Sequence, residues 1–330
     1  MKPSFVIFLA GLVGVPSAAQ PQPAGPLRLE QTIPMPGVEG RIDHLSVDLR
    51  GSRLFVAALE NNTVEVLDLR AGKRIHTIGG LQESQGLVYL PESDRIAVAN
   101  GGDGACRFFD AKTFQPGQVV SLSEDADNVR YDRASQRLYV GYGKGAIGIV
   151  DATTGRRLGD IKLEGHPESF QLEQSGPRIF VNVPTAGHIA VLDREKQAVA
   201  TRWPVTRAGA NFPMALDESN HRLFIGCRKP AVMLVFDTTR GQAVARLSSA
   251  GDADDLFYDA RRKRVYLSGG EGFISVFDQQ DANHYQEIAR IPTAARARTS
   301  LFVPELDRLF VAVPHVGDQA AEARVYEIRP

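Results

Sequence analysis

Two short segments of the chain are near-copies of each other and rich in acid. They read DADN at 125–128 and DADD at 252–255. Asp127 and Asp254, joined by Asp43 from an earlier segment, could together bind a cation, a sugar-like polyol or a basic peptide. Carboxylates that converge without a countercharge repel one another, which raises their pKa values or requires a cation. Arg296 and Arg298 could supply that charge. The alternative is that these acids are solvated residues that bond only to water.

Histidines provide a second possible chemistry, which is metal binding. Imidazole and carboxylate ligands suit zinc, copper and non-haem iron, and Asp43 or Glu168 could complete such a set. However, no two of the histidines that we expect near the acids lie at short ligand spacing. These histidines are His44, His166, His188 and His315. We therefore interpret them as isolated surface or capping residues, assign no metal ligand and predict no cofactor.

Sequence signatures of nucleophilic catalysis and of phosphate binding are missing. The chain has no G-x-S-x-G motif, which would place a serine on a strained elbow. The segments GGDG (101–104) and GGEG (269–272) read as hairpin turns, because they lack the helix and lysine of phosphate-binding loops. Cys106 and Cys227 form no CxxC motif, and we expect both to be unpaired and buried.

The elements that position these residues follow from a motif that occurs seven times. Its form is R-[LIV]-[FYA]-[VIL], and consecutive copies begin 41 to 44 residues apart. The copies begin at Arg53, Arg95, Arg137, Arg178, Arg222, Arg264 and Arg308. A period of roughly 40 to 45 residues with several short strands per unit is typical of a β-propeller blade. The sequence therefore predicts an all-β, seven-bladed propeller.

Each repeat divides into four antiparallel strands. In the first repeat they are 45–48, 53–59, 63–69 and 73–78. The seventh repeat stops at its third strand, 323–330, while an additional strand, 27–34, precedes the first repeat. Pairing of these two segments would complete the last blade, close the ring and remove the exposed sheet edges. We thus expect one domain that spans residues 27–330.

Two repeated features of the blades are interpreted as scaffold. Third strands end in an acid, whose carboxylate can accept hydrogen bonds from the next turn. Five of the seven motif arginines follow an acid by five residues, so we expect ion pairs across the turn between first and second strands. These five acids are Asp48, Asp132, Glu173, Asp217 and Asp259. In this interpretation each arginine serves its own blade.

The propeller fold gathers the starts of the inner strands around the mouth of its central channel, which is the default binding face. The residue pairs there are Asp43-His44, Gln85-Gly86, Asp127-Asn128, Glu168-Ser169, Phe212-Pro213, Asp254-Asp255 and Arg298-Thr299. Side chains from different blades can meet only near the axis, so these positions are the candidate ligand contacts. The predicted binding residues are Asp43, His44, Asp127, Asn128, Glu168, Asp254, Asp255 and Arg298.

The N-terminus predicts export. A lysine, an apolar run and the small residues Ser17-Ala18-Ala19 form a secretory signal cleaved after Ala19, which makes residues 1–19 a signal peptide. Residues 20–26 form a Pro-rich linker. The mature chain has 37 basic and 39 acidic side chains, a balance of −2, which gives no electrostatic reason to bind nucleic acid. We expect a periplasmic or secreted monomer with no membrane span after cleavage.

The repeats resemble a known family. The segment 60–100, with RIAVAN (95–100), RLYVGY (137–142) and RLFVAA (53–58), is similar to the YVTN-type propeller repeat, and the similarity covers essentially the whole mature chain. The P-x-G element of that repeat is degenerate here, since Ser84-Gln85-Gly86 keeps only the glycine. The resemblance implies an exported bacterial propeller of the YncE-like group that acts as a binding scaffold.

Three hypotheses for function remain. The first is a non-catalytic exported propeller that binds a small ligand or a protein partner at the channel mouth. The second is a metal-dependent lactonase-like hydrolase or a lyase, because such enzymes use acids, Asn and His at a propeller mouth. The third is an accessory subunit of a periplasmic redox enzyme. The absence of a recognisable catalytic set favours the first.

Overall fold

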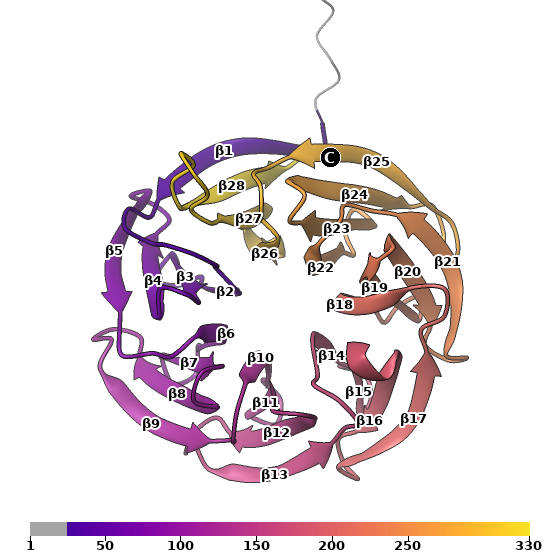
Figure 1. The fold of residues 1–330 in the computed structure, drawn as a ribbon, viewed down its shortest axis with the longest axis horizontal. Helices are drawn as coiled ribbons and strands as arrows, with labels where there is room; N and C mark the ends of the chain where they lie inside the picture. The colour runs from indigo at the N-terminus through magenta and orange to yellow at the C-terminus, as the bar shows by residue number, and fades with distance from the viewer. Residues whose placement is uncertain (1–24) are drawn as a thin grey trace, which may run out of the picture.

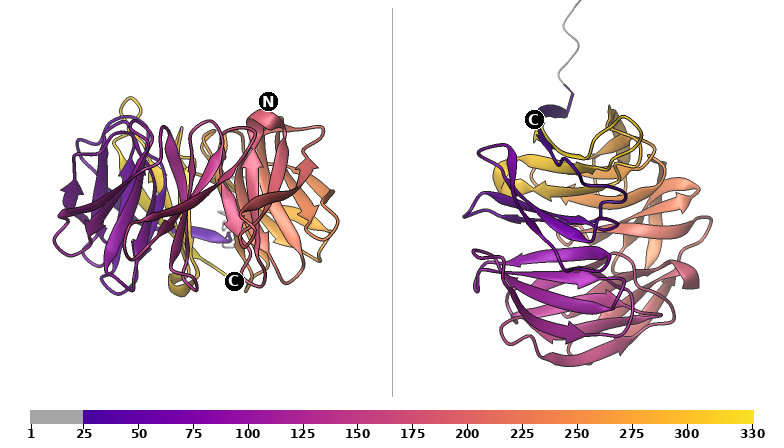
Figure 2. Two further views of the ribbon diagram at one scale, coloured as in Figure 1. Left: turned by 90° about the horizontal axis from the view of Figure 1, so that it is seen from below. Right: turned by 60° about the vertical axis from the view of Figure 1, so that its left-hand side comes forward.

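The computed structural model describes residues 25–330. Seven four-stranded antiparallel sheets stand around a central axis, as the sequence predicts (Figure 1). The first strand of each repeat lies innermost in its sheet, and the polar fourth strands form the rim (Figure 1). Seen from the side, the sheets lie next to one another with their turns at the two ends of the ring (Figure 2). The predicted signal peptide and most of the linker fall outside the described residues.

The strand boundaries match the predicted ones to within about two residues, the usual uncertainty of helix and strand ends. Blade 1 contains β2 (Leu45–Asp48), β3 (Arg53–Ala58), β4 (Thr63–Asp68) and β5 (Lys73–Ile78). Blade 2 contains β6 (Ser84–Leu90), β7 (Arg95–Asn100), β8 (Ala105–Asp110) and β9 (Pro116–Ser121). Blade 3 contains β10 (Ala126–Asp132), β11 (Arg137–Tyr142), β12 (Ala146–Asp151) and β13 (Arg157–Lys162). Blade 4 contains β14 (Phe170–Leu172), β15 (Arg178–Val183), β16 (His188–Asp193) and β17 (Ala198–Pro204).

The remaining blades follow the same plan. Blade 5 contains β18 (Gly209–Asp217), β19 (Arg222–Lys229), β20 (Ala231–Asp237) and β21 (Gln242–Ser248). Blade 6 contains β22 (Ala253–Asp259), β23 (Arg264–Gly269), β24 (Phe273–Gln279) and β25 (Tyr285–Pro292). Blade 7 contains β26 (Thr299–Val303), β27 (Arg308–Val313), β28 (Glu322–Ile328) and β1 (Leu27–Pro34). Two short 3-10 turns, Pro184–Ala186 and Pro304–Leu306, interrupt blades 4 and 7.

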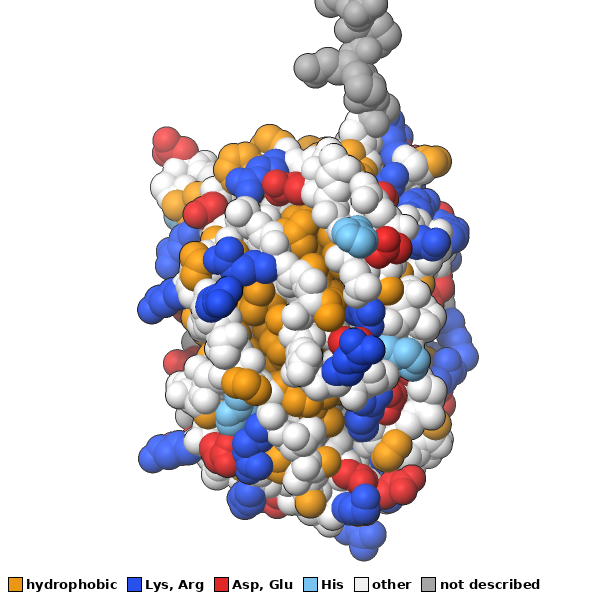
Figure 3. All heavy atoms as spheres, turned by 90° about the vertical axis from the view of Figure 1, so that its right-hand side faces the viewer, with side chains coloured by type: hydrophobic (Ala, Val, Ile, Leu, Met, Phe, Trp, Pro, Cys, Tyr) orange, Lys and Arg blue, Asp and Glu red, His pale blue; other side chains and the backbone are white. Residues whose placement is uncertain are grey.

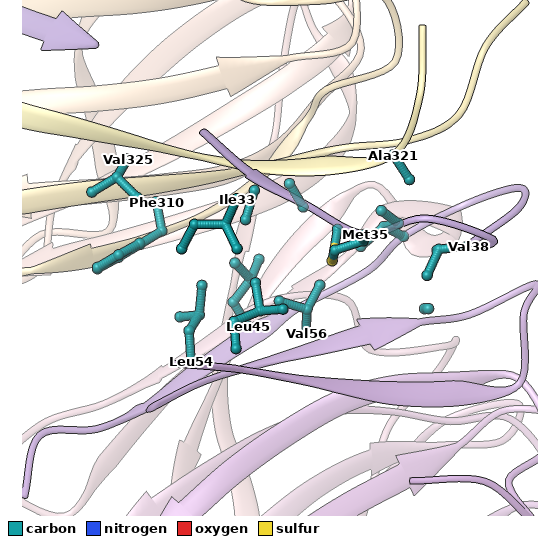
Figure 4. Packing of buried hydrophobic residues seen from close by; sticks show 14 of the residues in the cluster. Ile33, Met35, Val38, Leu45, Leu54, Val56, Phe310, Ala321 and Val325 are labelled. Atoms are coloured by element: carbon teal, nitrogen blue, oxygen red, sulfur yellow. The ribbon is translucent and has the colours of Figure 1, made fainter. Parts of the chain in front are cut away.

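The N-terminal strand closes the ring. β1 pairs antiparallel with β28, from Leu27 opposite Ile328 to Pro34 opposite Glu322. Ile33 on β1 is fully buried in an apolar cluster that also contains Phe310 of blade 7 and Leu54 of blade 1 (Figure 4). The first strand of the chain therefore completes the last blade and packs it against the first, which confirms the predicted closure.

The motif arginines link neighbouring blades, which corrects the expectation that each serves its own blade. Five of them donate to a backbone carbonyl in the following blade, near the end of its third strand. The acceptors are Ala111 for Arg53, Ala152 for Arg95, Thr238 for Arg178, Ala282 for Arg222 and Arg329 for Arg264. A guanidinium has five N–H donors at the end of a long side chain, so it can bond to the next blade as well as to its own turn.

The predicted ion pair across the first turn forms in only two of the five blades. Arg53 lies 2.7 Å from Asp48, and Arg178 pairs with Glu173. In blade 3 the predicted partner Asp132 is bound instead by Arg194 of blade 4, at 3.0 Å. Asp217 accepts from Ser219, Asn220 and Gln279, and Arg222 pairs with Asp237. Asp259 pairs with Arg262. The pairing failed in these blades because closer donors occupy the acids.

The acids at the ends of the third strands behave as predicted in five blades. In each, one carboxylate oxygen accepts from two backbone N–H groups, those of the residues two and three positions later, and this stabilises the turn to the fourth strand. These acids are Asp68, Asp110, Asp151, Asp193 and Asp237. In blade 6 the equivalent turn uses Asp281 instead.

The state of the two cysteines agrees with the sequence analysis. Cys106 and Cys227 are buried free thiols, and burial raises the pKa of each to about 12. No helix within residues 25–330 has the length and apolarity needed to cross a membrane. On the face of the rim seen in Figure 3, charged side chains of both signs are scattered around an apolar band. That face has no continuous basic field.

Candidate functional site

The first residue of every inner-strand start lies at one polar hollow in the channel mouth. The hollow has two connected parts, which share Arg41, Asp127, Glu168, Phe212 and Asp254. The outer part, which we call the mouth cup, has a volume of about 220 Å³. It is lined by Arg41, Gln85, Asp125, Asp127, His166, Glu168, Phe212, Arg228, Asp254 and Arg298. The inner pocket beneath it adds Asp43, His44, Asn128 and Ser169.

β-Bulges aim several of these side chains at the axis. The pairing of the first and second strands shifts register between Ser84 and Leu87, and between Ala126 and Val129. Equivalent shifts occur between Asn211 and Met214, and between Ala253 and Asp255. The bulged residues include Gln85, Asp127, Phe212 and Asp254, all of which line the mouth cup. A bulge leaves residues unpaired in the ladder and changes the direction of their side chains. The bulges in the inner strands therefore direct these four side chains into the mouth cup.

Gly86 permits the close approach of two blades at this point. A Cβ atom on Gly86 would lie 2.2 Å from the carbonyl oxygen of Asp127 and 3.0 Å from the nitrogen of Val129. Both contacts are with backbone, which cannot move aside without distorting β10. The glycine that survives from the degenerate repeat element is therefore required to position Asp127.

Two arginines and two acids form one network on the side of blades 5 to 7. Arg228 lies 2.6 Å from Asp254 and 3.4 Å from Asp252. Arg298 lies 2.9 Å from Asp252 and 2.8 Å from Asp254 Oδ2, although the latter contact is not aligned as a hydrogen bond. The Arg228 guanidinium also stacks on the Phe212 ring, 3.7 Å from its centroid. These charges compensate one another and fix the wall of the mouth cup.

His44 joins blade 1 to blade 6. Its ring nitrogens lie 3.5 Å from Asp255 and 3.8 Å from Asp43, and Arg41 binds Asp43 at 2.9 Å. Burial alone would lower the pKa of His44, but the carboxylates of Asp255 and Asp43 outweigh it and raise the pKa to about 10. Burial raises the pKa of Asp43 to about 6, against the effect of His44 and Arg41. His44 is therefore a cation at neutral pH.

His166 is likewise close to two carboxylates, both in blade 3. Its ring lies 3.4 Å from Asp125 and 3.7 Å from Asp127, and Nδ1 is 2.7 Å from the Gly143 carbonyl oxygen. Burial opposes protonation, but Asp127 and the Gly143 carbonyl raise the pKa of His166 to about 9. Burial would raise the pKa of Asp127, yet His166 and His44 hold it below its usual value. The pair is thus charged at neutral pH.

Glu168 differs from the other acids of the site. Six carboxylates here have a cationic side chain within 4 Å, whereas no ion pair or side-chain hydrogen bond of Glu168 occurs within residues 25–330. Burial is the main reason that the pKa of Glu168 rises to about 8, and the negative charge of Asp127 adds to it. An unpaired acid that is partly removed from water is a favourable place for a ligand group.

Asn128 is a second unsatisfied group. Its side chain lines the inner pocket, the residue is 3% exposed, and its Oδ1 atom has no hydrogen-bond partner. Buried amides nearly always have partners. The inner pocket has a volume of about 10 Å³, close to the size needed for one water molecule.

All of the predicted site residues lie at the channel. Seven line the mouth cup or the inner pocket, and Asp255 lies below them in a second cavity of about 280 Å³ that His44 and Arg130 also line. Sequence reasoning missed Arg41 and Arg228. Arg41 lies two residues before an inner-strand start, as do Asp125 and His166, and that shared offset could have revealed it. Arg228 lies near the end of β19, beyond the repeated motif, and no pattern in the sequence pointed to it.

Two of the four candidate histidines lie at the channel mouth, and the other two lie elsewhere. His44 and His166 belong to the site, whereas His188 contacts Glu164 at 3.4 Å and His315 contacts Glu39 at 2.7 Å. Within residues 25–330, no group of three or more His, Cys, Asp or Glu side chains is arranged to hold a metal ion. The four histidines therefore do not lie together as one ligand set within residues 25–330.

Comparison with known proteins identifies relatives of the chain. It is 23% identical over 227 residues to the uncharacterized protein YncE of Salmonella typhimurium and 22% identical over 227 residues to YncE of Salmonella typhi. The chain is a distant homologue of YncE. The first match spans 67% of this chain and 60% of the YncE sequence, so it leaves a substantial part of the relative unmatched. No family model matches the chain.

Solved structures confirm the architecture. A chain of the mitotic checkpoint complex superposes with a TM-score of 0.78 and 13% identity, covering 98% of this chain and 99% of that chain. A chain of Kuenenia stuttgartiensis hydrazine synthase superposes with a TM-score of 0.72 and 14% identity, covering 84% of this chain and 94% of that chain. At such identities the likeness concerns the fold alone.

Proposed function

We propose that the protein is an exported binding scaffold that accepts a small polar ligand, or a charged side chain of a protein partner, at the channel mouth. One observation carries the proposal. Side chains from all seven blades surround a single polar hollow, and some of its groups lack partners. Glu168 has no ion pair within residues 25–330, and Asn128 Oδ1, Arg41 Nε and Asp254 Oδ2 are buried without a hydrogen-bond partner. Concave sites with a few convergent polar groups are the usual places for ligands.

The charged groups of the site support binding rather than catalysis. Most of its acids and cations pair with each other, which holds them rigidly and leaves no nucleophile next to a general base. A groove of about 230 Å³ on the rim, where His76 stacks on Phe114, is a competing cavity. It is lined mainly by apolar residues of blades 1 and 2 and lacks convergence from the other blades.

A thermal-shift screen tests the proposal. Amines, carboxylic acids, sugars and phosphorylated compounds are added separately to the wild type and to the Asp127→Asn/Glu168→Gln double variant. Asp254 is left in place because Arg228 and Arg298 both pair with it. The control variant is Glu195→Gln, at an exposed turn carboxylate.

We expect at least one compound to raise the melting temperature of the wild type and of the control, but not of the double variant. A ligand at 100 times its Kd stabilises a protein by about 2.7 kcal/mol, which is readily detected. The proposal is wrong if no compound stabilises the wild type, or if every stabilising compound acts equally on the double variant.

A further inference from the structure

The side chains around the channel mouth include more carboxylates than cations. The site contains seven carboxylates, from Asp43, Asp125, Asp127, Glu168, Asp252, Asp254 and Asp255. It contains six cations, from Arg41, His44, Arg130, His166, Arg228 and Arg298. Seven minus six leaves an excess of one acid, and Glu168 is the carboxylate without a cation within 4 Å. A ligand that brings a positive charge to Glu168 would be electrostatically complementary.

The unpaired side-chain oxygen of Asn128 also favours a ligand that donates hydrogen bonds. Asn128 Oδ1 is an acceptor, and it lines the same inner pocket as Glu168. Arg41 and His44 also line this pocket; they pair with Asp43 and Asp255, although Arg41 Nε has no hydrogen-bond partner. An anionic ligand group placed between Glu168 and Asn128 would meet two acceptors. A donor with several N–H groups would satisfy both residues at once.

The volume of the inner pocket restricts the shape of that donor. At about 10 Å³ it takes a group of the size of one water molecule. A primary ammonium head is of this size, whereas a guanidinium or a trimethylammonium group is several times larger. The mouth cup above it, of about 220 Å³, accommodates the remainder of a small ligand or the stem of one side chain.

We propose that the ligand of this site carries a primary ammonium group, which enters the inner pocket and binds the carboxylate of Glu168 and Oδ1 of Asn128. This inference rests on the proposed function, since it specifies the chemistry of a ligand at the same site. A free alkylamine and the lysine side chain of a protein partner share this chemistry.

Proton release accompanies binding. Glu168 is faced by Asp127 and Asp254, which favour its protonated form. It is also faced by His166, Arg228 and Arg41, which favour its ionised form. Because burial dominates and raises its pKa to about 8, Glu168 is largely protonated at pH 7 and must ionise to pair with ammonium. The affinity for an amine should therefore rise about tenfold from pH 6 to pH 7.

Isothermal titration calorimetry with butylammonium tests the inference. Titrations of the mature chain at pH 7 in two buffers of different ionisation enthalpy measure both affinity and proton release. Butyltrimethylammonium and 1-butanol serve as ligand controls. Glu168→Gln removes the carboxylate, and Glu195→Gln is the matched protein control. A peptide with blocked ends and one lysine is a second probe, which distinguishes a free amine from a lysine of a partner.

We expect butylammonium or the lysine peptide to bind with release of close to one proton. Trimethylation or Glu168→Gln should weaken binding at least tenfold, while Glu195→Gln should leave it unchanged. The inference is overturned if neither primary amine binds, or if the trimethylated analogue binds equally well. In that case a sugar or acid that stabilises the wild type but not the double variant would leave the proposed function standing, and only the ammonium assignment would fall.

Discussion

At the scale of single residues, the site combines compensated charges with one exception. His44, His166 and the arginines neutralise most of the acids, so the walls of the channel mouth are fixed by ion pairs. Glu168 is held among them without a partner. The protein therefore retains in its folded state a carboxyl group whose ionisation is unfavourable, and this has a measurable effect on stability.

The pH dependence of stability reports on Glu168 directly. Because its folded pKa of about 8 lies above the ordinary value of a carboxyl, the folded state binds this proton more tightly than the unfolded state. Its contribution to stability is complete below the ordinary pKa and is lost as the pH rises toward 8. We expect the melting temperature of the wild type to fall by a few degrees relative to Glu168→Gln between pH 5 and pH 9. Parallel melting curves of the two proteins across this range would show that Glu168 has an ordinary pKa.

At the scale of elements, the repeated arginines hold blades to their neighbours. Arg178 pairs with Glu173 in its own blade and donates to Thr238 in the next, at 2.6 Å. Arg137 occupies the equivalent position in blade 3, yet no ion pair of Arg137 occurs within residues 25–330, because Arg194 takes its expected partner. The same motif position thus has two different energetic roles.

This difference yields a matched pair of substitutions. Arg178→Ala should lower the free energy of unfolding by about 1–3 kcal/mol, since it leaves a mostly buried Glu173 carboxylate without its main partner. Arg137→Ala should cost less than about 0.5 kcal/mol, as is usual for partly exposed side chains without such contacts. Chemical denaturation measures both. Equal losses for the two variants would contradict the assignment of different energetic roles to Arg178 and Arg137.

The closing strand provides a second prediction at this scale. Deletion of residues 27–34 should remove several of the roughly 5–15 kcal/mol typical of a domain, because β28 loses its partner and an apolar cluster opens. Within the same strand, Ile33→Ala should cost about 2–5 kcal/mol, and Arg28→Ala, at an exposed ion pair, less than about 1 kcal/mol. A cooperative melt that is unaffected by the deletion would refute closure by β1.

The blades and the location of the site could be predicted from the sequence for one reason. A propeller repeats the same local pattern, so the spacing of RLYVGY and its relatives indicates both the strands and the positions near the axis. The pairs Asp127-Asn128 and Asp254-Asp255 followed from that symmetry. The ion-pair partners could not be predicted in this way. A side chain at a blade interface is in reach of donors from two blades, and the sequences of those blades differ. Arg228 and the unpaired state of Glu168 depend on such contacts and required the structure.

At the scale of the whole molecule, the ring brings the inner-strand starts of seven similar units to one face, which we propose as the binding face, and export would place that face outside the cytoplasm. The predicted signal peptide gives a direct test. Mass spectrometry of the protein recovered from the periplasm or medium should find Gln20, in free or cyclised form, at the N-terminus. Recovery of the exported protein with an intact Met1 would contradict cleavage after Ala19.

The central claim is that ligand recognition takes place where the seven inner strands begin. Hydrogen exchange followed by mass spectrometry measures this most directly, with and without the compound that raises the melting temperature most. The account predicts slower exchange in several separate segments near 41–44, 83–86, 125–128, 166–169, 210–213, 252–255 and 296–299, one from each blade. Protection confined to residues 76–80 and 107–119, which form the groove between blades 1 and 2, would place the site on the rim and contradict the account.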